Sequence, residues 1–166
     1  MDMLVVDVCV LIDLYNGDVL HRFFGMQAEV HISDVQVEEI NDEKGLTKEL
    51  IERYGAKTES HSSEEVARVY DLAGKHGEKR IADLFAFVLA KRLGAILLTG
   101  DRKLRTIALN NGLRCHGTLW VLDEMVDRNL LSNLEANNSL KKISVSNSFL
   151  PSSEVTKRLR LWQSEK

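Results

Sequence analysis

Proline is nearly absent from this chain of 166 residues, which contains one proline and ten glycines. No segment is enriched in serine, glycine and proline together, so we find no linker, low-complexity segment or internal repeat. A chain of this length without a linker fits one domain with its own core. Hydrophobic residues make up 44% and charged residues 28%, the proportions of an ordinary globular protein.

Long hydrophobic runs and an excess of positive charge are also missing. The longest apolar run, LFAFVLA, ends at Lys91 and is far too short to cross a bilayer. The start MDMLVVD lacks the basic leader of a signal peptide, so we expect no membrane association. The net charge of −3 argues against a protein that simply coats DNA, although it leaves room for local basic clusters around an acidic site.

Cysteine is scarce as well, with two residues in the chain. Cys9 and Cys115 both lie within strand-like runs, and we interpret them as buried free thiols in a reducing cytoplasm. The sequence also leaves a disulfide between them open.

Short apolar runs alternate with longer amphipathic segments along the chain. The runs predict buried strands at residues 3–8, 29–33, 56–60, 95–99 and 113–116. Helices are expected at 33–54, 63–76, 78–93, 102–111 and 118–131 and over the last dozen residues. Ser33 and Gln36 have the spacing of a capping box for the first of these helices.

Strands that alternate with helices of this length predict parallel pairing through crossover helices. We therefore expect an α/β fold, a three-layer α/β/α arrangement with a central, mostly parallel sheet. Residues 1–136 would form the main part, and residues 137–166 a C-terminal helical extension of the same domain. Ligand sites of such sheets lie off the carboxyl ends of the strands, where Asp7 and Asp101 follow two apolar runs.

Four acids stand at distinctive positions along the chain. Asp7 follows VV, Glu39 lies in the helical segment SDVQVEEI, Asp83 begins ADLFAFVLA, and Asp101 follows LLTG. Carboxylates gathered in one place repel one another, and a hard divalent cation removes that conflict. Mg²⁺ prefers oxygen ligands, and Mn²⁺ accepts a similar site.

In this order and at this spacing, the acids resemble the pattern of the PIN-domain family, over residues 1 to about 130. The matched segments are VVDVCVLIDL, Ser33 before EEI, Asp83 with Ala86 and Ala90, and TGDR. The run CHGTLWVLDEMVDRNLL is similar to the Gly-Thr-Leu segment of a toxin-like PIN subgroup.

The resemblance implies a metal-dependent endoribonuclease that hydrolyses RNA phosphodiester bonds, acting as the toxin of a toxin–antitoxin pair. Asp7, Asp83 and Asp101 would be direct or water-mediated ligands of Mg²⁺ or Mn²⁺, and Glu39 would hold metal-bound waters or a second ion. An antitoxin protein and a second copy of the chain are the implied partners.

Basic and hydroxyl groups flank the last acid. Arg102, Lys103 and Arg105 follow Asp101 directly, and we expect them to contact the phosphates of RNA; alone, such a cluster could be a solvated helix face. Thr99 ends the strand before them. Its hydroxyl would bind an acid or a phosphate, although a plain β-branched strand residue is the simpler interpretation.

Each acid also has an ordinary structural explanation. Asp101 could be the N-cap of the next helix, Asp83 could pair with Lys79 four residues earlier, and Glu39 could be a surface acid. Asp7 is harder to explain in this way, because an acid in a buried strand needs partners. We take the neighbouring Asp13 as a surface acid.

The residues after the first acid depart from the family pattern. Hydroxyl and amide side chains are usual there, whereas this chain has Val8 and Cys9. The alternative function is therefore a catalytically degenerate PIN-like domain that binds RNA or protein. A phosphoacceptor or phosphatase domain ranks lower, because DVCV offers neither a pair of adjacent acids nor Asp-x-Asp. His116 and Trp120 fit a surface or capping group and a core residue, respectively.

Overall fold

A parallel sheet of five short strands forms the centre of the computed structural model, which describes residues 1–40, 45–77 and 80–163. The strand order is β3-β2-β1-β4-β5, and every neighbouring pair is parallel. The strands are β1 (Met3–Val6), β2 (Glu29–Ser33), β3 (Lys57–Glu59), β4 (Ile96–Leu98) and β5 (Cys115–His116). The predicted α/β fold is confirmed.

The strand order reverses between β1 and β4. From β1 the chain moves outward through β2 to β3, then returns to the other side of β1 and moves outward again through β4 to β5. A crevice opens at such a reversal, beyond the carboxyl ends of the two central strands. Val6 pairs with Leu98 at this end, so the residues that follow β1 and β4 start out side by side.

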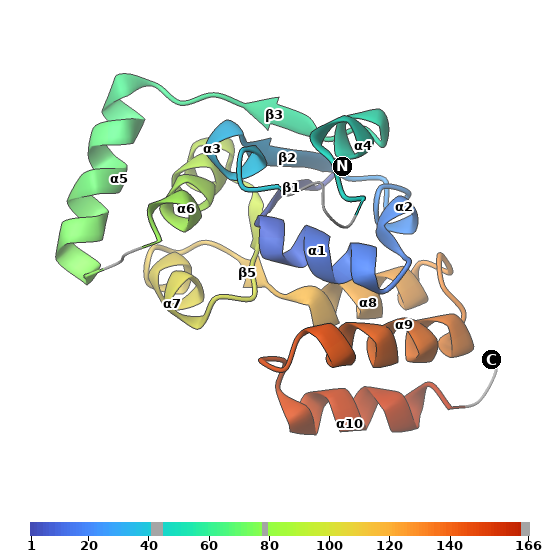
Figure 1. Ribbon diagram of the computed structural model, residues 1–166. Helices are drawn as coiled ribbons and strands as arrows, with labels where there is room; N and C mark the ends of the chain where they lie inside the picture. Colours follow the sequence, from blue (N-terminus) through green and yellow to red (C-terminus); the bar gives the residue numbers. More distant parts are fainter. Residues whose placement is uncertain (41–44, 78–79, 164–166) are drawn as a thin grey trace.

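Both faces of the sheet are buried under helices, which gives the three layers visible in Figure 1. Leu4 and Val6 belong to the core on one face and Val5 to the core on the other, because successive side chains of a strand point to opposite faces. Strands buried on both faces have to be apolar throughout, as these are.

The helices divide between the two cores. The core on one face contains side chains of α6 (Ile81–Leu93), α7 (Arg102–Asn110) and α5 (Ser63–His76), and α5 packs against α6. The other face packs against α1 (Val8–Asn16), α2 (Leu20–Phe23) and α8 (Thr118–Asp127). Between β2 and β3 the chain forms two short helices, α3 (Asp34–Val37) and α4 (Lys48–Arg53).

The last two helices form an additional layer over α1 (Figure 1). They are α9 (Asn133–Ser146) and α10 (Ser152–Leu161), and they contribute Leu140, Ile143 and Val155 to the same core as α1. Gly17 lets α9 approach closely, since a Cβ there would lie 2.4 Å from the Ser139 hydroxyl oxygen. The predicted division after residue 136 falls inside α9 and stays a prediction.

Two details of the predicted elements were wrong. Val8 begins α1 rather than ending the first strand, because Asp7 acts as the N-cap of that helix. The helix expected over 33–54 is interrupted: α3 ends at Val37, and a new helix starts after the N-cap Thr47. Part of that interval, and Lys79 with its proposed ion pair, lie outside the described residues.

No helix in the part of the chain that the structure describes is both long enough and apolar enough to cross a bilayer. Cys9 is half-buried and Cys115 buried, and both are free thiols.

Candidate functional site

Asp7 lies at the carboxyl end of β1 and is almost fully buried, with 1% of its surface exposed. The Thr99 hydroxyl donates to its Oδ2 (2.7 Å), and the Gln36 amide (3.0 Å) and the Cys9 backbone N–H (3.4 Å) donate to its Oδ1. A buried carboxylate needs such donors. They hold Asp7 in one orientation, at the point where the strand order reverses.

Thr99 connects this carboxylate to the next acid. Its hydroxyl donates to Asp7 and accepts from the backbone N–H of Asp101 (3.1 Å). Asp101 in turn accepts from the Leu104 backbone N–H (2.8 Å), so it is the N-cap of α7. Since Thr99 is fully buried, it orients the acids and cannot touch a substrate in this conformation.

Asp83 lies in the first turn of α6 with 1% of its surface exposed. Neither of its oxygens accepts a hydrogen bond within the described residues, and its ion-pair partner is Arg80, whose Nε is 3.2 Å from Oδ2. Burial raises the pKa of Asp83 to about 7, with further increases from the charges of Asp7, Asp101 and Glu39 that outweigh the effect of Arg80. This carboxyl group therefore takes up a proton at a much higher pH than an ordinary aspartate.

The charges of all four predicted acids affect the pKa of one guanidinium group, that of Arg80. Burial would lower the pKa of Arg80, yet the charges of Asp83, Asp7, Asp101 and Glu39 raise it overall. Glu39 is exposed and lies in the turn after α3. The prediction that it lies in a helix was wrong. The structure therefore brings carboxylates from four distant parts of the chain into one negative field.

In the structure, the four acids are too widely spaced for three of them to coordinate one ion directly. Within residues 1–40, 45–77 and 80–163, no three His, Cys, Asp or Glu side chains are grouped tightly enough to hold one ion. The set nevertheless suits a hard divalent cation. Asp83 has two buried oxygens without donors and a raised pKa, and a cation would both accept those oxygens as ligands and restore their charge.

Comparison with protein families agrees with this geometry. A family model described as a PIN domain matches residues 3–164. The chain belongs to the PIN-domain family. No curated protein matches the chain by sequence. The match extends over α9 and α10, so these helices are included in this PIN-domain model.

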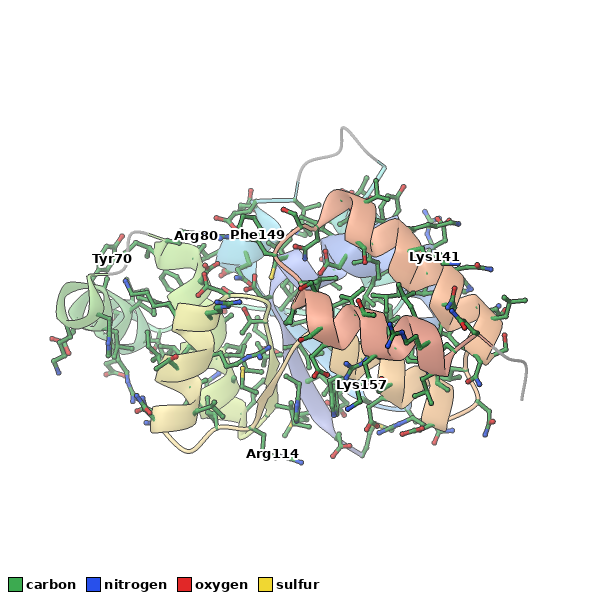
Figure 2. All side chains as sticks on the ribbon, turned by 90° about the horizontal axis from the view of Figure 1, so that it is seen from below. Tyr70, Arg80, Arg114, Lys141, Phe149 and Lys157 are labelled. Atoms are coloured by element: carbon green, nitrogen blue, oxygen red, sulfur yellow. The ribbon has the colours of Figure 1, made fainter. Side chains whose placement is uncertain are left out.

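Two of the four acids, Asp7 and Asp101, line a cleft of about 820 Å³ in this PIN domain, whereas Asp83 and Glu39 are not among its lining residues. Arg80, Arg102 and the loop between α9 and α10 also line this cleft. Figure 2 shows Arg80 and Phe149, which belongs to that loop, close together at this opening. The cleft therefore combines carboxylates with cationic groups that can meet an anionic substrate.

The three basic residues that we predicted to contact RNA phosphates differ in their position relative to the cleft. Arg102 lines the cleft, whereas Arg105 lines a neighbouring pocket and donates weakly to the Thr99 carbonyl oxygen (3.4 Å). Lys103 is not among the cleft-lining residues, and its ammonium group donates to the Gly77 carbonyl oxygen at the end of α5 (3.3 Å).

Sequence reasoning missed three residues of the site. Gln36 does not complete a capping box with Ser33, because its side chain is fully buried and donates to Asp7. Arg80 pairs with Asp83 at a spacing of three residues, which the sequence could have suggested. Asp13 is buried rather than on the surface, and it accepts from the Thr118 hydroxyl group (2.7 Å).

Cys9 replaces the hydroxyl or amide group usual in the family. Its sulfur accepts from the Gly100 backbone N–H (3.5 Å) and so joins the start of α1 to the turn after β4. Burial, and next the charge of Asp7, raise the pKa of the thiol far enough to keep it neutral. Cys9 therefore adds no charge to the site, and Thr99 and Gln36 orient Asp7 in this chain.

Proposed function

We propose that this PIN domain is a metal-dependent endoribonuclease that hydrolyses phosphodiester bonds of RNA. The observation that carries the proposal is Asp83: a buried carboxyl group without hydrogen-bond donors, in the field of three other acids. Such a group is stable as a carboxylate when a cation is bound beside it.

Asp7, Asp83 and Asp101 would hold Mg²⁺ or Mn²⁺ directly or through water, and Glu39 would hold water around the ion from the exposed side. When bound, such an ion lowers the pKa of a coordinated water and balances negative charge at the phosphorus. The chain itself supplies orientation. Thr99 fixes the relative positions of Asp7 and Asp101 through one hydroxyl group.

Positively charged side chains at the cleft would bind the phosphates of the RNA substrate. Arg80 and Arg102 line this cleft beside the acids, and each carries a guanidinium group suited to a phosphate oxygen. The local charges thus allow a chain with net charge −3 to receive RNA, provided that the ion offsets part of the acidic field.

The rival function is a PIN-like domain that binds RNA or protein without turnover. It is favoured by the absence, among the described side chains, of three potential ligands already grouped around one point. A cleavage assay distinguishes the two functions, because a domain that only binds RNA would associate with it without releasing a cleaved product.

The decisive experiment measures cleavage of end-labelled single-stranded RNA with Mn²⁺. We expect Asp7→Asn and Asp101→Asn to abolish cleavage and to leave the circular dichroism spectrum unchanged, and we expect Glu39→Gln to reduce cleavage only in part. Asp71→Asn is the matched control, because Asp71 is exposed on α5 and pairs only with Lys75 among its described salt bridges. Full cleavage by both variants, or by the unmodified chain in excess EDTA, would overturn the proposal.

The proposal extends to the setting implied by the toxin-like segment at residues 115–131. There the chain would act in the cytoplasm as a homodimer that an antitoxin protein holds inactive. The free thiols Cys9 and Cys115 suit a reducing compartment. Arrest of growth by the unmodified chain, and normal growth with Asp7→Asn, would support the toxin role.

A further inference from the structure

The loop between α9 and α10, residues 147–151, separates two hollows at the carboxyl end of the sheet. One is the acidic cleft, and the other is a pocket of about 260 Å³ lined by Arg105, His116 and Trp120 among others. Phe149 lines both of them. Phe149 is 89% exposed, so its ring is open to a partner beside the charged cleft.

A chain of hydrogen bonds holds this loop in position. Buried Asp13 accepts from the Thr118 hydroxyl (2.7 Å) and from the Asn147 amide (3.0 and 3.1 Å). The Asn147 side-chain oxygen then accepts from the backbone N–H of Phe149 (3.0 Å). Phe149 is thus displayed in water from a backbone that is fixed to the core of the domain.

The pocket behind Phe149 combines flat rings with positive charge. His116 and Trp120 are stacked, with ring centroids 4.3 Å apart and planes inclined by 9°. Burial, and then the charges of Arg105 and Arg114, lower the pKa of His116, so its ring is neutral at neutral pH. The Arg105 Nε is buried without a hydrogen-bond partner in the part of the chain that is described.

Arg105 as a whole is only half-buried and lines the pocket, so its guanidinium group can meet a phosphate oxygen there. Phe149 and Arg102 line both this pocket and the acidic cleft, so a strand that passes from one hollow to the other would meet both residues.

We propose that Phe149 is a stacking platform for one unpaired base of the RNA, with the adjoining phosphate held by Arg102 and Arg105. This inference rests on the proposed function, and it deepens that function by naming the side chain that holds a base of the substrate beside the acidic cleft. A duplex keeps its base faces stacked inside the helix, whereas an unpaired base can turn onto an aromatic ring.

The test measures binding of a fluorescent oligouridylate in the Asp7→Asn background with Mn²⁺, by fluorescence anisotropy. Loss of one base–aromatic stack weakens binding by roughly 5- to 100-fold, which is the change expected for Phe149→Ala. Phe149→Trp should retain the affinity. Tyr70→Ala is the matched control and should change nothing, because Tyr70 is an exposed aromatic residue on α5, far from Phe149 in Figure 2.

An abasic scan of the oligonucleotide locates the stacked base. At one position, removal of the base should cost the same affinity as Phe149→Ala, and the two losses should not add, because they delete the same contact. Equal affinity of Phe149→Ala and its parent, or equally tight binding of a duplex, would overturn the platform and leave the exposed ring for a protein partner.

Cleavage by the unmodified chain is followed in parallel, and it distinguishes the two proposals. Cleavage with an affinity that does not depend on Phe149 removes the platform and keeps the nuclease. If binding depends on Phe149 and no RNA is cleaved, the platform is kept and the nuclease proposal is rejected.

Discussion

The charge of Asp83 should destabilise the fold whenever no cation is bound, and Asp83→Asn should relieve that cost. The side chain is 1% exposed, and its pKa is raised from 3.8 to about 7 in the folded chain. Each pKa unit corresponds to ~1.36 kcal/mol, so ionised Asp83 costs up to about 4 kcal/mol of the free energy of unfolding.

The direction of the effect follows from the raised pKa. Well below pH 4 the carboxyl is protonated in both the folded and the unfolded chain, and the substitution changes little. Between about pH 4 and pH 7 the unfolded chain gives up this proton while the folded chain keeps it, so the stability of the unmodified chain falls over this range and levels off above about pH 7. The stability of Asp83→Asn relative to the unmodified chain should therefore increase from pH 4 to pH 8.

Urea unfolding followed by circular dichroism, in EDTA at several pH values, measures this difference. Asp71→Asn serves as control, because its side chain is 63% exposed and lies on α5, outside the residues that line the acidic cleft. A pH dependence of stability that is the same in Asp83→Asn and in the unmodified chain between pH 5 and 8 would refute the reasoning.

The same measurement with Mn²⁺ in place of EDTA connects stability to the proposed site. A ligand at 100 times its dissociation constant stabilises the folded state by ≈ 2.7 kcal/mol. The unmodified chain should gain most of this at pH 8, and Asp83→Asn clearly less, since one ligand has lost its charge. An equal gain in both chains would argue that the ion binds elsewhere.

Two further substitutions test the hydrogen bonds that hold Asp7, Asp101 and Asp13 in position. Thr99→Val removes the hydroxyl between Asp7 and Asp101, and we expect a loss of ~1–3 kcal/mol in urea unfolding together with slower cleavage, whereas unchanged stability would mean that water replaces the hydroxyl. Asn147→Ala removes a donor to Asp13, whose pKa burial already raises, so stability should fall by ~1–3 kcal/mol at pH 8 and less at pH 4. Equal losses at both pH values would contradict the second expectation.

Much of the fold could be predicted because its signals are local. Short apolar runs followed by an acid predicted β1 and β4, and the amphipathic segment 78–93 predicted α6. The N-cap role of Asp101 is also a local property, since it depends on the residue itself and the next turn of helix. These features could therefore be recognised without knowing what packs against them.

Other features depend on contacts between distant segments. Whether Gln36 completes a capping box or donates to Asp7 is decided by the position of β1, 29 residues away. Asp13 looks like a surface acid in the sequence, yet Thr118 and Asn147, from distant segments, make its burial tolerable. No local pattern contains this information, because the partners are brought together only when the sheet is assembled.

The sequence by itself determined the kind of fold and the identity of the four acids, because strand ends, helix periods and acidic positions are written in neighbouring residues. Only the tertiary structure decided how these acids affect one another. It buries Asp83 without donors, joins Asp7 to Asp101 through Thr99, and brings Phe149 from the far end of the chain to the rim of the cleft. Charge interactions and burial depend on distance in space, and the chain sets those distances only when it folds.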